Sequence, residues 1–350
     1  LRADVALEVI VANTRAVTER GTIDGVPITR LARFATVRSQ PIVPGIVAAL
    51  RHQRPDIVHL HVPNPLVELA YLSSSLCDRG RLVLTWHSDV VRQRWLARGY
   101  AHVARRVAAR ADAICVATPA HVTASTILPA FAAKCHPCPF GVEHPPRGAV
   151  PGALRDRFGR RPLIVAVGRL VDYKGFDVLI DAMVGIDATA LIIGDGPQRR
   201  PLAARIAAQG LAGVVRLIGP VTDLGPYLAA ADVFVLPSRT RAEMFGIVQL
   251  EAMAHGVPVV STRLGTGVEW VNRDGETGLV VPPGDPAALH AAVQSLLADA
   301  PRRVRLGRAA QRRVRKTFSI DAAVGSVRTV YETVLGGSWS AAVPERAHVA

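Results

Sequence analysis

Residues 163–176 read LIVAVGRLVDYKGF, and this stretch decides the fold of the second half of the chain. Five apolar residues, Leu163–Val167, end at a glycine, which predicts a fully buried parallel strand. Arg169 follows that glycine, and Lys174-Gly175 comes shortly afterwards. Ligands of open α/β sheets bind at the carboxyl ends of strands, so two cations here suit a diphosphate. Taken alone, such cations are equally well explained as surface charge.

Short apolar runs of this kind recur along the chain and alternate with Ala- and Arg-rich helical stretches. Strands that alternate with helices form βαβ crossovers, and the length is enough for two domains. We therefore predict an α/β fold in which two doubly wound, Rossmann-like parallel sheets face a cleft. The other predicted strands are Leu7–Ala12, Ile57–His61, Leu82–Thr85, Ala113–Ala117, Ala190–Ile193, Val214–Ile218, Val233–Leu236, Val257–Val260 and Leu279–Val281.

The stretch Phe140–Pro162 is rich in Pro, Gly and Arg, and we interpret it as the linker between the two domains. The domains are predicted over residues 1–145 and 160–320. A C-terminal helix over 321–335 and a loose tail over 336–350 are predicted to follow them.

A second informative stretch, residues 241–259, reads RAEMFGIVQLEAMAHGVPV. Gly246 and the later His-Gly pair are typical of the start and the end of a short helix. Ile247, Leu250 and Ala254 fall on one side of that helix, which predicts a buried stripe.

Two carboxylates accompany this helix: Glu243 lies before it and Glu251 within it. The exposed amides of a helix N-terminus bind phosphate, and nearby carboxylates accept hydrogen bonds from sugar and ribose hydroxyls. The plainer interpretation is a loop charge for Glu243 and a solvated helix residue for Glu251.

Glu243 and Glu251 have the E-x7-E spacing of retaining glycosyltransferases, and the chain resembles glycosyltransferase family 4 over about residues 5–335. The resemblance implies a GT-B fold and a nucleotide-sugar-dependent glycosyltransferase. Further matching segments are GRL at 168–170 with KG at 174–175, IIGDGP at 192–197, ADVFVLPS at 231–238, EAMAHGVPVV at 251–260 and GETGLVVPPGD at 275–285.

The resemblance assigns the C-terminal domain to the nucleotide sugar. It implies that Arg169 and Lys174 are catalytic residues that bind the donor diphosphate. Glu243, also expected to be catalytic, would hold the transferred sugar, and Glu251 would hold the ribose. The other expected donor-binding residues, several of them through their backbone, are Gly168, Phe245, Gly246, Ile247 and Val248.

The resemblance assigns the N-terminal domain to the acceptor. Polar residues follow predicted strands in DIVHLHVPNP (56–65) and LVLTWHSDVVRQ (82–93). TWHSD is similar to the family segment in which a histidine faces the anomeric centre, so His87 is expected to be catalytic. A lone histidine, however, is more often structural. The expected acceptor-side residues are His61, Asn64 and Asp89.

The segments HVPNP, WHSDVV and TGVEWVN look most like those of bacterial lipopolysaccharide and polysaccharide enzymes, many of them mannosyl- or rhamnosyltransferases. The resemblance therefore implies a retaining hexosyltransferase. Its donor would be a nucleotide diphosphate sugar, GDP-mannose-like or a UDP-sugar, and its acceptor a glycan or lipid-linked glycan. Two alternatives remain open, a nucleotide-sugar 2-epimerase of the same fold and a catalytically impaired membrane-associated scaffold.

No cofactor and no metal are expected. Neither half carries a DxD pair of aspartates near a strand end, and two side-chain cations can supply the charge that Mg²⁺ would. Cys135 and Cys138 form a C-x-x-C pair, but no second pair follows. We therefore interpret them as structural cysteines, with a zinc site as the lesser alternative.

The chain has a net charge of +14, only four cysteines, and no apolar run long enough to span a membrane. Sparse cysteines favour a reducing, cytoplasmic compartment. The densest basic run, Arg302–Lys316, is typical of a solvated helix face or of peripheral contact with an anionic membrane. Aromatic residues make up only 5% and are not interleaved with basic ones, so no nucleic-acid partner is expected.

The first residues, LRADVALEVIVAN, read as the end of a helix that runs into a strand. In the family this is the second strand, preceded by a first strand, a loop with paired glycines and most of a helix. We therefore expect the first strand-loop-helix of the domain to be missing. We also expect the chain in this form to be poorly soluble or nearly inactive until roughly 20–30 upstream residues are restored. A divergent enzyme that manages without this unit is the alternative.

Overall fold

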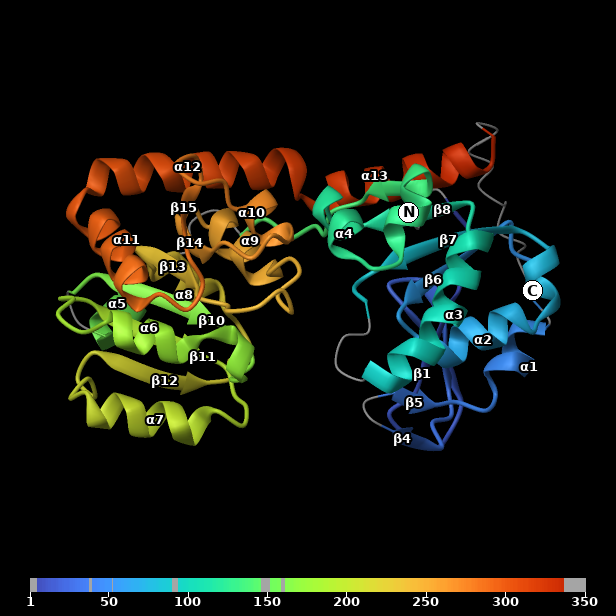
Figure 1. Ribbon diagram of the computed structural model, residues 1–350, viewed down its shortest axis with the longest axis horizontal. Coiled ribbons are helices and arrows are strands. Elements are labelled where there is room, and N and C mark those ends of the chain that lie inside the picture. Colours follow the sequence, from blue (N-terminus) through green and yellow to red (C-terminus); the bar gives the residue numbers. More distant parts are fainter. Residues whose placement is uncertain are drawn as a thin grey trace, which may run out of the picture. The chain divides into compact units, whose positions relative to one another are not determined.

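The structure, a computed structural model, describes residues 5–37, 40–51, 53–89, 94–145, 152–158 and 161–336. The chain divides into two compact units, shown as ribbons in Figure 1. The first comprises Leu1–Cys138 with Val324–Ala350, and the second comprises Pro139–Ala323. The predicted tail lies outside the described residues from position 337 onward, and parts of the predicted linker lie outside them too.

A parallel sheet forms the centre of the second unit. Its strands are β10 Leu163–Val167, β11 Thr189–Ile193, β12 Val215–Gly219, β13 Val233–Leu236, β14 Val259–Thr262 and β15 Gly278–Val281. They lie within two residues of the predicted strands, and their spatial order is β12-β11-β10-β13-β14-β15. The chain moves outward from β10 to β12 and then returns to pair β13 with β10, so the order reverses between those two strands.

Helices pack on this sheet and close the hydrophobic core. Ile164 and Ala166 of β10 join one buried cluster with Leu179, Val293 and Leu306 from three of these helices. The helices of the unit are α5 Gly152–Phe158, α6 Phe176–Ala182, α7 Arg199–Ala208, α8 Gly225–Ala230, α9 Ile247–Ala254, α10 Gly267–Val271, α11 Pro286–Ala298 and α12 Ala300–Thr317. Among the helices that the structure describes, none combines the length and the apolar character needed to cross a membrane.

The basic run of the sequence lies on α12 and divides into two groups. Arg303 donates hydrogen bonds to two carbonyls in the last turn of α11, at 3.0 and 3.2 Å. Arg313 likewise donates to two carbonyls at the end of α10, at 2.6 and 3.1 Å. These two arginines satisfy helix C-termini and are structural. The exposed members, which match the predicted solvated face, are Arg305, Arg308, Arg312, Arg315 and Lys316.

The first unit contains a second parallel sheet, in the order β6-β7-β8-β9. Its strands are β6 Ile57–Val62, β7 Arg81–Trp86, β8 Ala113–Val116 and β9 Cys135–Pro137. Leu60 and Leu84 point to the face covered by α2 Pro65–Leu72 and α3 Arg94–Arg110. The residues that alternate with them along the strands, such as Val83, point to the opposite face, where Tyr331 of α13 Ile320–Val334 packs. The unit also contains the short helices α1 Ile46–Arg51 and α4 Pro119–Ala124.

Besides β9, the predicted set lacks four strands of the first unit: β2 Glu19–Ile23, β3 Val26–Leu31, β4 Ala35–Val37 and β5 Gln40–Ile42. β3 pairs parallel with β1 Val9–Ala12 and antiparallel with β2. Asp24 and Gly25 form the turn between β2 and β3, with φ of 49° and 76°. Asp-Gly is a strong hairpin signal, but β2 is largely polar and exposed, so a search for apolar runs passes over it.

Candidate active site

The carboxyl ends of β10 and β13 lie side by side where the strand order of the second unit reverses. The loops that follow these strands are joined, because the Arg239 N–H donates to the Tyr173 carbonyl at 2.8 Å. Gly175 has a φ of 67°, and a Cβ on it would lie 2.1 Å from the Pro237 carbonyl oxygen. Only glycine permits this approach. The two motifs of the second half therefore meet at the switch point, where open α/β sheets bind ligands.

An ion pair inside this junction links the two loops. Lys174 Nζ lies 2.5 Å from Glu243 Oε2, and the two side chains are only 13% and 9% exposed. The Ser238 hydroxyl donates to the same carboxylate oxygen at 2.9 Å, and the Thr266 hydroxyl donates to the Glu243 carbonyl at 2.8 Å. The interpretation of Lys174 and Glu243 as surface charges is therefore wrong, because both are held in a buried, hydrogen-bonded pair.

Arg169 has the opposite surroundings. Its side chain is exposed, and its guanidinium has no ion-pair or hydrogen-bond partner among the residues that the structure describes. The backbone around it is fixed, since Gly168 N–H donates to the Ile193 carbonyl at 3.0 Å and Leu170 N–H to the Asp195 carbonyl at 2.9 Å. An unpaired cation on an anchored loop is suited to receive an anion.

Helix α9 begins directly behind Gly246, as predicted, and its N-terminus opens toward this junction. Gly246 has a φ of 69°, and a Cβ there would lie 2.7 Å from Leu236 Cδ2. Within the described part of the chain, no side chain caps the helix. The Gln249 N–H donates to the Gly246 carbonyl at 2.9 Å, which leaves the N–H groups of Ile247 and Val248 for a ligand, as at many anion sites.

One prediction about α9 is wrong. Ile247 is 43% exposed and does not belong to the buried stripe, although Leu250 and Ala254 do. The helix is covered along most of its length; Ile247 is exposed, and Val248 and Glu251 are half-buried. Phe245 is 4% exposed and its ring packs edge-on against two other phenylalanines, so only its backbone can meet a ligand.

Glu251 lies in the second turn of α9 and is half-buried. Burial raises the pKa of its carboxyl above the ordinary value. No described residue donates a hydrogen bond to this carboxylate. A half-buried acid without a donor is suited to bind hydroxyl groups of a ligand.

In the first unit, the two predicted histidines meet. His61 lies on β6 and His87 directly follows β7, and Nδ1 of the former is 2.9 Å from Nε2 of the latter. Their rings stack with centroids 5.2 Å apart. Asn64 lies nearby, at the N-cap of α2, where its N–H donates to Glu68 Oε1 at 2.7 Å.

Asp89 is engaged within the chain. Its carboxylate accepts hydrogen bonds from the Trp86 indole at 3.1 Å and from the Ser125 hydroxyl at 2.7 Å. The N–H and the hydroxyl of Thr126 donate to it at 2.7 and 2.9 Å. These contacts close the loop that carries His87 onto the segment after α4. The acceptor-side role of Asp89 stays a prediction, and the observed contacts favour support of the loop.

Sequence reasoning missed His59, which precedes His61 by two residues and therefore shares its face of β6. His59 Nδ1 lies 2.6 Å from the Tyr331 hydroxyl and Nε2 lies 2.7 Å from the Thr85 hydroxyl. Burial, together with His61 and His87, lowers the pKa of His59 to about 4. Burial also lowers the pKa values of His61 and His87, so all three imidazoles are neutral near pH 7. The pattern His-x-His within a strand was the available signal.

The C-x-x-C pair does not converge on one site. Cys135 packs on the face of the sheet that α2 and α3 cover, whereas Cys138 packs on the opposite face with Tyr331. Both carry free thiols. Two ligands on opposite faces of a sheet cannot share one tetrahedral zinc ion, which argues against the zinc alternative for this pair.

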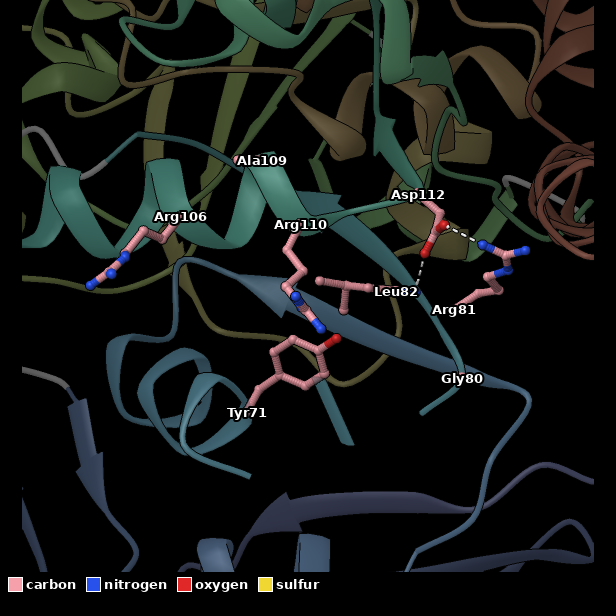
Figure 2. A pocket seen from close by; sticks show the side chains of 8 residues that line it. All are labelled: Tyr71, Gly80, Arg81, Leu82, Arg106, Ala109, Arg110 and Asp112. Atoms are coloured by element: carbon pink, nitrogen blue, oxygen red, sulfur yellow. Dashed lines mark hydrogen bonds and ion pairs between the residues drawn. The ribbon is translucent and has the colours of Figure 1, made fainter. Parts of the chain in front are cut away.

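A hollow of about 680 Å³ lies at the amino-terminal end of β7 and the last turns of α3. Figure 2 shows Arg81 there, paired with Asp112 at 3.1 Å, and Arg110 directed toward Tyr71. His87 follows the other end of β7. This hollow is therefore not part of the candidate site.

Comparison with known proteins identifies related chains for both halves. The description "Glycosyl transferase 4-like domain" matches residues 1–141, and "Glycosyl transferases group 1" matches residues 161–299. The D-rhamnosyltransferase WbpZ of Pseudomonas aeruginosa is 34% identical over 270 residues, which cover 75% of this chain and 70% of that protein. The O-antigen chain mannosyltransferase C of Escherichia coli is 30% identical over 286 residues, 80% of this chain and 76% of that protein.

Solved structures share the fold. Sucrose-phosphate synthase from Thermosynechococcus elongatus is similar over 96% of this chain and 92% of its own, with a TM-score of 0.76 and 23% identity. HepE from Anabaena, in complex with UDP, is similar over 89% of this chain and 86% of its own, with a TM-score of 0.75 and 21% identity. The GT-B fold predicted from the sequence is confirmed.

The buried pair generates a prediction about stability. Lys174→Met leaves the Glu243 carboxylate buried without its cation, so the free energy of unfolding should fall by about 3–5 kcal/mol. The double variant K174M/E243Q carries no unpaired charge and should be more stable than K174M. Arg169→Met, at an exposed cation, should stay within about 0.5 kcal/mol of the parent. Urea unfolding measures all three, and equal stabilities for K174M and R169M would contradict the assignment of a buried pair.

Proposed function

The chain belongs to the glycosyltransferase family whose 4-like and group 1 domains match its two halves, and we propose that it is a retaining hexosyltransferase. The proposed donor is a nucleotide diphosphate sugar, GDP-mannose-like or a UDP-sugar, and the proposed acceptor is a glycan or lipid-linked glycan. The relatives are named for rhamnosyl transfer and for O-antigen mannosyl transfer. Those names support a place in bacterial surface polysaccharide synthesis.

The observation that carries the proposal is the convergence of unsatisfied groups at the switch point of the second unit. Arg169 is an exposed cation without a partner among the described residues, the N-terminus of α9 is uncapped, and Glu251 is a half-buried acid without a donor. A cation and helix amides suit a diphosphate, and a carboxylate suits ribose hydroxyls. A nucleotide diphosphate sugar supplies partners for all three groups.

The buried ion pair determines which groups can supply positive charge to the donor. Lys174 and Glu243 neutralise one another, so we assign most of the net positive charge that meets the diphosphate to Arg169 and the helix N-terminus. When donor binding separates the pair, Lys174 supplies positive charge to the leaving diphosphate. Glu243 binds a hydroxyl of the transferred sugar, and we assign it no nucleophilic role.

In the proposed reaction, the bond between the anomeric carbon and the diphosphate oxygen breaks through an oxocarbenium-like state. The acceptor oxygen bonds to the same face of that carbon, and its proton passes to the departing phosphate oxygen. Charge grows on the diphosphate as it leaves, which is where fixed cations accelerate the step. His87 is assigned to the anomeric centre, and His61 and Asn64 belong to the acceptor side of the first unit.

The role of Arg169 predicts a catalytic loss without a folding loss. Arg169→Met should lower kcat by about 10²–10³-fold, the usual cost of removing a partner of transition-state charge. Arg200→Met, at an exposed cation on α7, is the matched control and should retain activity. Released nucleotide diphosphate, measured with and without acceptor, gives the rate. Near-normal turnover in R169M rules out this role. Conversion of the donor into its epimer without acceptor, with no net release of nucleotide diphosphate, favours the 2-epimerase.

The absence of a metal from the proposed chemistry is also testable. Arg169 and the amides of α9 supply the charge that Mg²⁺ provides in metal-dependent transferases. Activity should therefore survive dialysis against EDTA and should not rise when Mg²⁺ or Mn²⁺ is added back. Loss on chelation that either cation restores would contradict the proposal.

Peripheral contact with an anionic membrane is proposed for the exposed basic stripe of α12, because lipid-linked glycans are among the proposed acceptors. Arg305, Arg308 and Arg312 lie on one side of that helix at spacings of three and four residues. Binding to anionic vesicles, measured by sedimentation, should weaken as salt is added. It should also weaken roughly fivefold for each of these residues that is replaced by Gln. Arg200→Gln, on α7, is the control. Equal sedimentation with neutral vesicles would contradict an electrostatic contact.

A further inference from the structure

The two central strands of the first unit bring three imidazoles into one row. In the parallel register of β6 and β7, His61 lies opposite Thr85 and Val62 opposite Trp86. The His87 N–H then donates to the Val62 carbonyl at 2.9 Å, which fixes the backbone of His87 one step beyond the end of β7. His59, His61 and His87 share one face because they fall at alternate positions of the two strands.

His59 is held from two sides and forms the base of the row. One of its ring nitrogens meets the Tyr331 hydroxyl on α13, and the other meets the Thr85 hydroxyl on β7. Its ring stacks on that of His61 with centroids 5.2 Å apart and an interplanar angle of 17°. Since a hydroxyl can donate or accept, both contacts are satisfied by a neutral ring. His59 therefore cannot turn without the loss of at least one hydrogen bond.

The contact between His61 and His87 contains a single proton when both rings are neutral. One of the two facing nitrogens must donate and the other must accept, so the tautomer of one ring determines that of the other. The titratable groups that face the row from neighbouring elements are His121 on α4, Tyr331 on α13, Cys115 on β8 and Cys138 after β9. The hydrogen bond couples the tautomers of the two rings, so a change at His61 reaches His87.

We propose that His61 is the positioning residue of His87, whose ring orientation and tautomer it fixes through Nδ1, with His59 as its stacked support. This inference rests on the proposed role of His87 in hexose transfer. His61 was expected to contact the acceptor directly; under this inference it acts on the reaction through His87 instead. Tyr331 thereby links α13 to the same row, through His59.

Side-chain geometry allows a sharp test. Asparagine carries its amide at the distance of Nδ1 from the backbone, whereas glutamine carries it farther out. His61→Asn can therefore keep the contact with His87, and H61Q and H61A cannot. We expect kcat to fall roughly 10- to 100-fold in H61Q and H61A, the range seen when a partner that fixes a metal-bound histidine is removed. The donor KM should change little, H61N should keep most of the activity, and His102→Ala, at an exposed histidine of α3, should match the parent.

A second readout does not depend on activity. Nitrogen-15 NMR of the substrate-free protein, with ring nitrogens assigned, should show one tautomer of His87 in the parent and in H61N, and a mixture in H61A. The pKa of His87 should rise toward its ordinary value in H61A, because one cause of its lowering, His61, is gone. The low-pH limit of kcat should then move to higher pH. Tyr331→Phe should shift the Nδ1 resonance of His59, because that nitrogen loses its hydroxyl partner, and it tests the row in a second, independent place.

The outcomes separate the two proposals. An unchanged tautomer of His87 in H61A, or full activity in H61A and H61Q, would overturn the positioning role of His61. If the parent transfers no hexose from any donor, the proposed function fails, and the ring spectra still decide the role of His61. Should H61A unfold, the comparison of H61N with H61Q, together with Y331F, decides it.

Discussion

The pairing of β10 with β13 is the constraint on which the rest of the candidate site depends. Because the chain leaves β10 in one direction and returns on its other side, two loops far apart in sequence end at one edge of the sheet. Their contact is so close that Gly175 tolerates no Cβ, and the space between the loops takes a lysine and a glutamate out of water. Burial of two charges is costly, and here one hydrogen bond from Ser238 and the short ion-pair distance offset that cost.

The two units use opposite electrostatic arrangements. At the switch point, one buried pair is neutral and fixed, while Arg169 and Glu251 remain without partners among the described residues. In the first unit, burial keeps the histidine row uncharged, with repulsion from neighbouring histidines as a further cause at His59 and His87. Hydrogen bonds to two hydroxyls hold His59 at the base of the row. A charged second unit and a neutral histidine row in the first agree with the proposed reaction, in which charge develops on the diphosphate and not on the acceptor.

Much of this was readable from the sequence, for identifiable physical reasons. Buried parallel strands are short apolar runs, so β10 and β13 were predicted to the residue. The start of α9 was predicted because Gly246 adopts a backbone conformation that other residues avoid. The hairpin of β2 and β3 was not predicted, because β2 is polar and exposed and lacks that apolar signature. Ile247 was misplaced because periodicity identifies a helix face but not which turn of the helix reaches the surface.

Side-chain partners were the part that the sequence could not supply. Residues 174 and 243 are far apart in the chain, and only the strand order shows that they pair. The same holds for His59 and Tyr331, which belong to opposite ends of the sequence. Spacing within a motif indicates which residue types are present, whereas their protonation and orientation follow from neighbours that tertiary structure brings in.

The most direct test of the central claim is a calorimetric titration of the chain with GDP and UDP. Each diphosphate is compared with the corresponding monophosphate and nucleoside. The account predicts that at least one diphosphate binds and that affinity drops at each loss of a phosphate. It also predicts that R169M removes the preference for diphosphate over monophosphate while the fold remains intact. Absence of binding by either diphosphate, or a preference that R169M leaves unchanged, would contradict the assignment of the β10–β13 junction as the donor site.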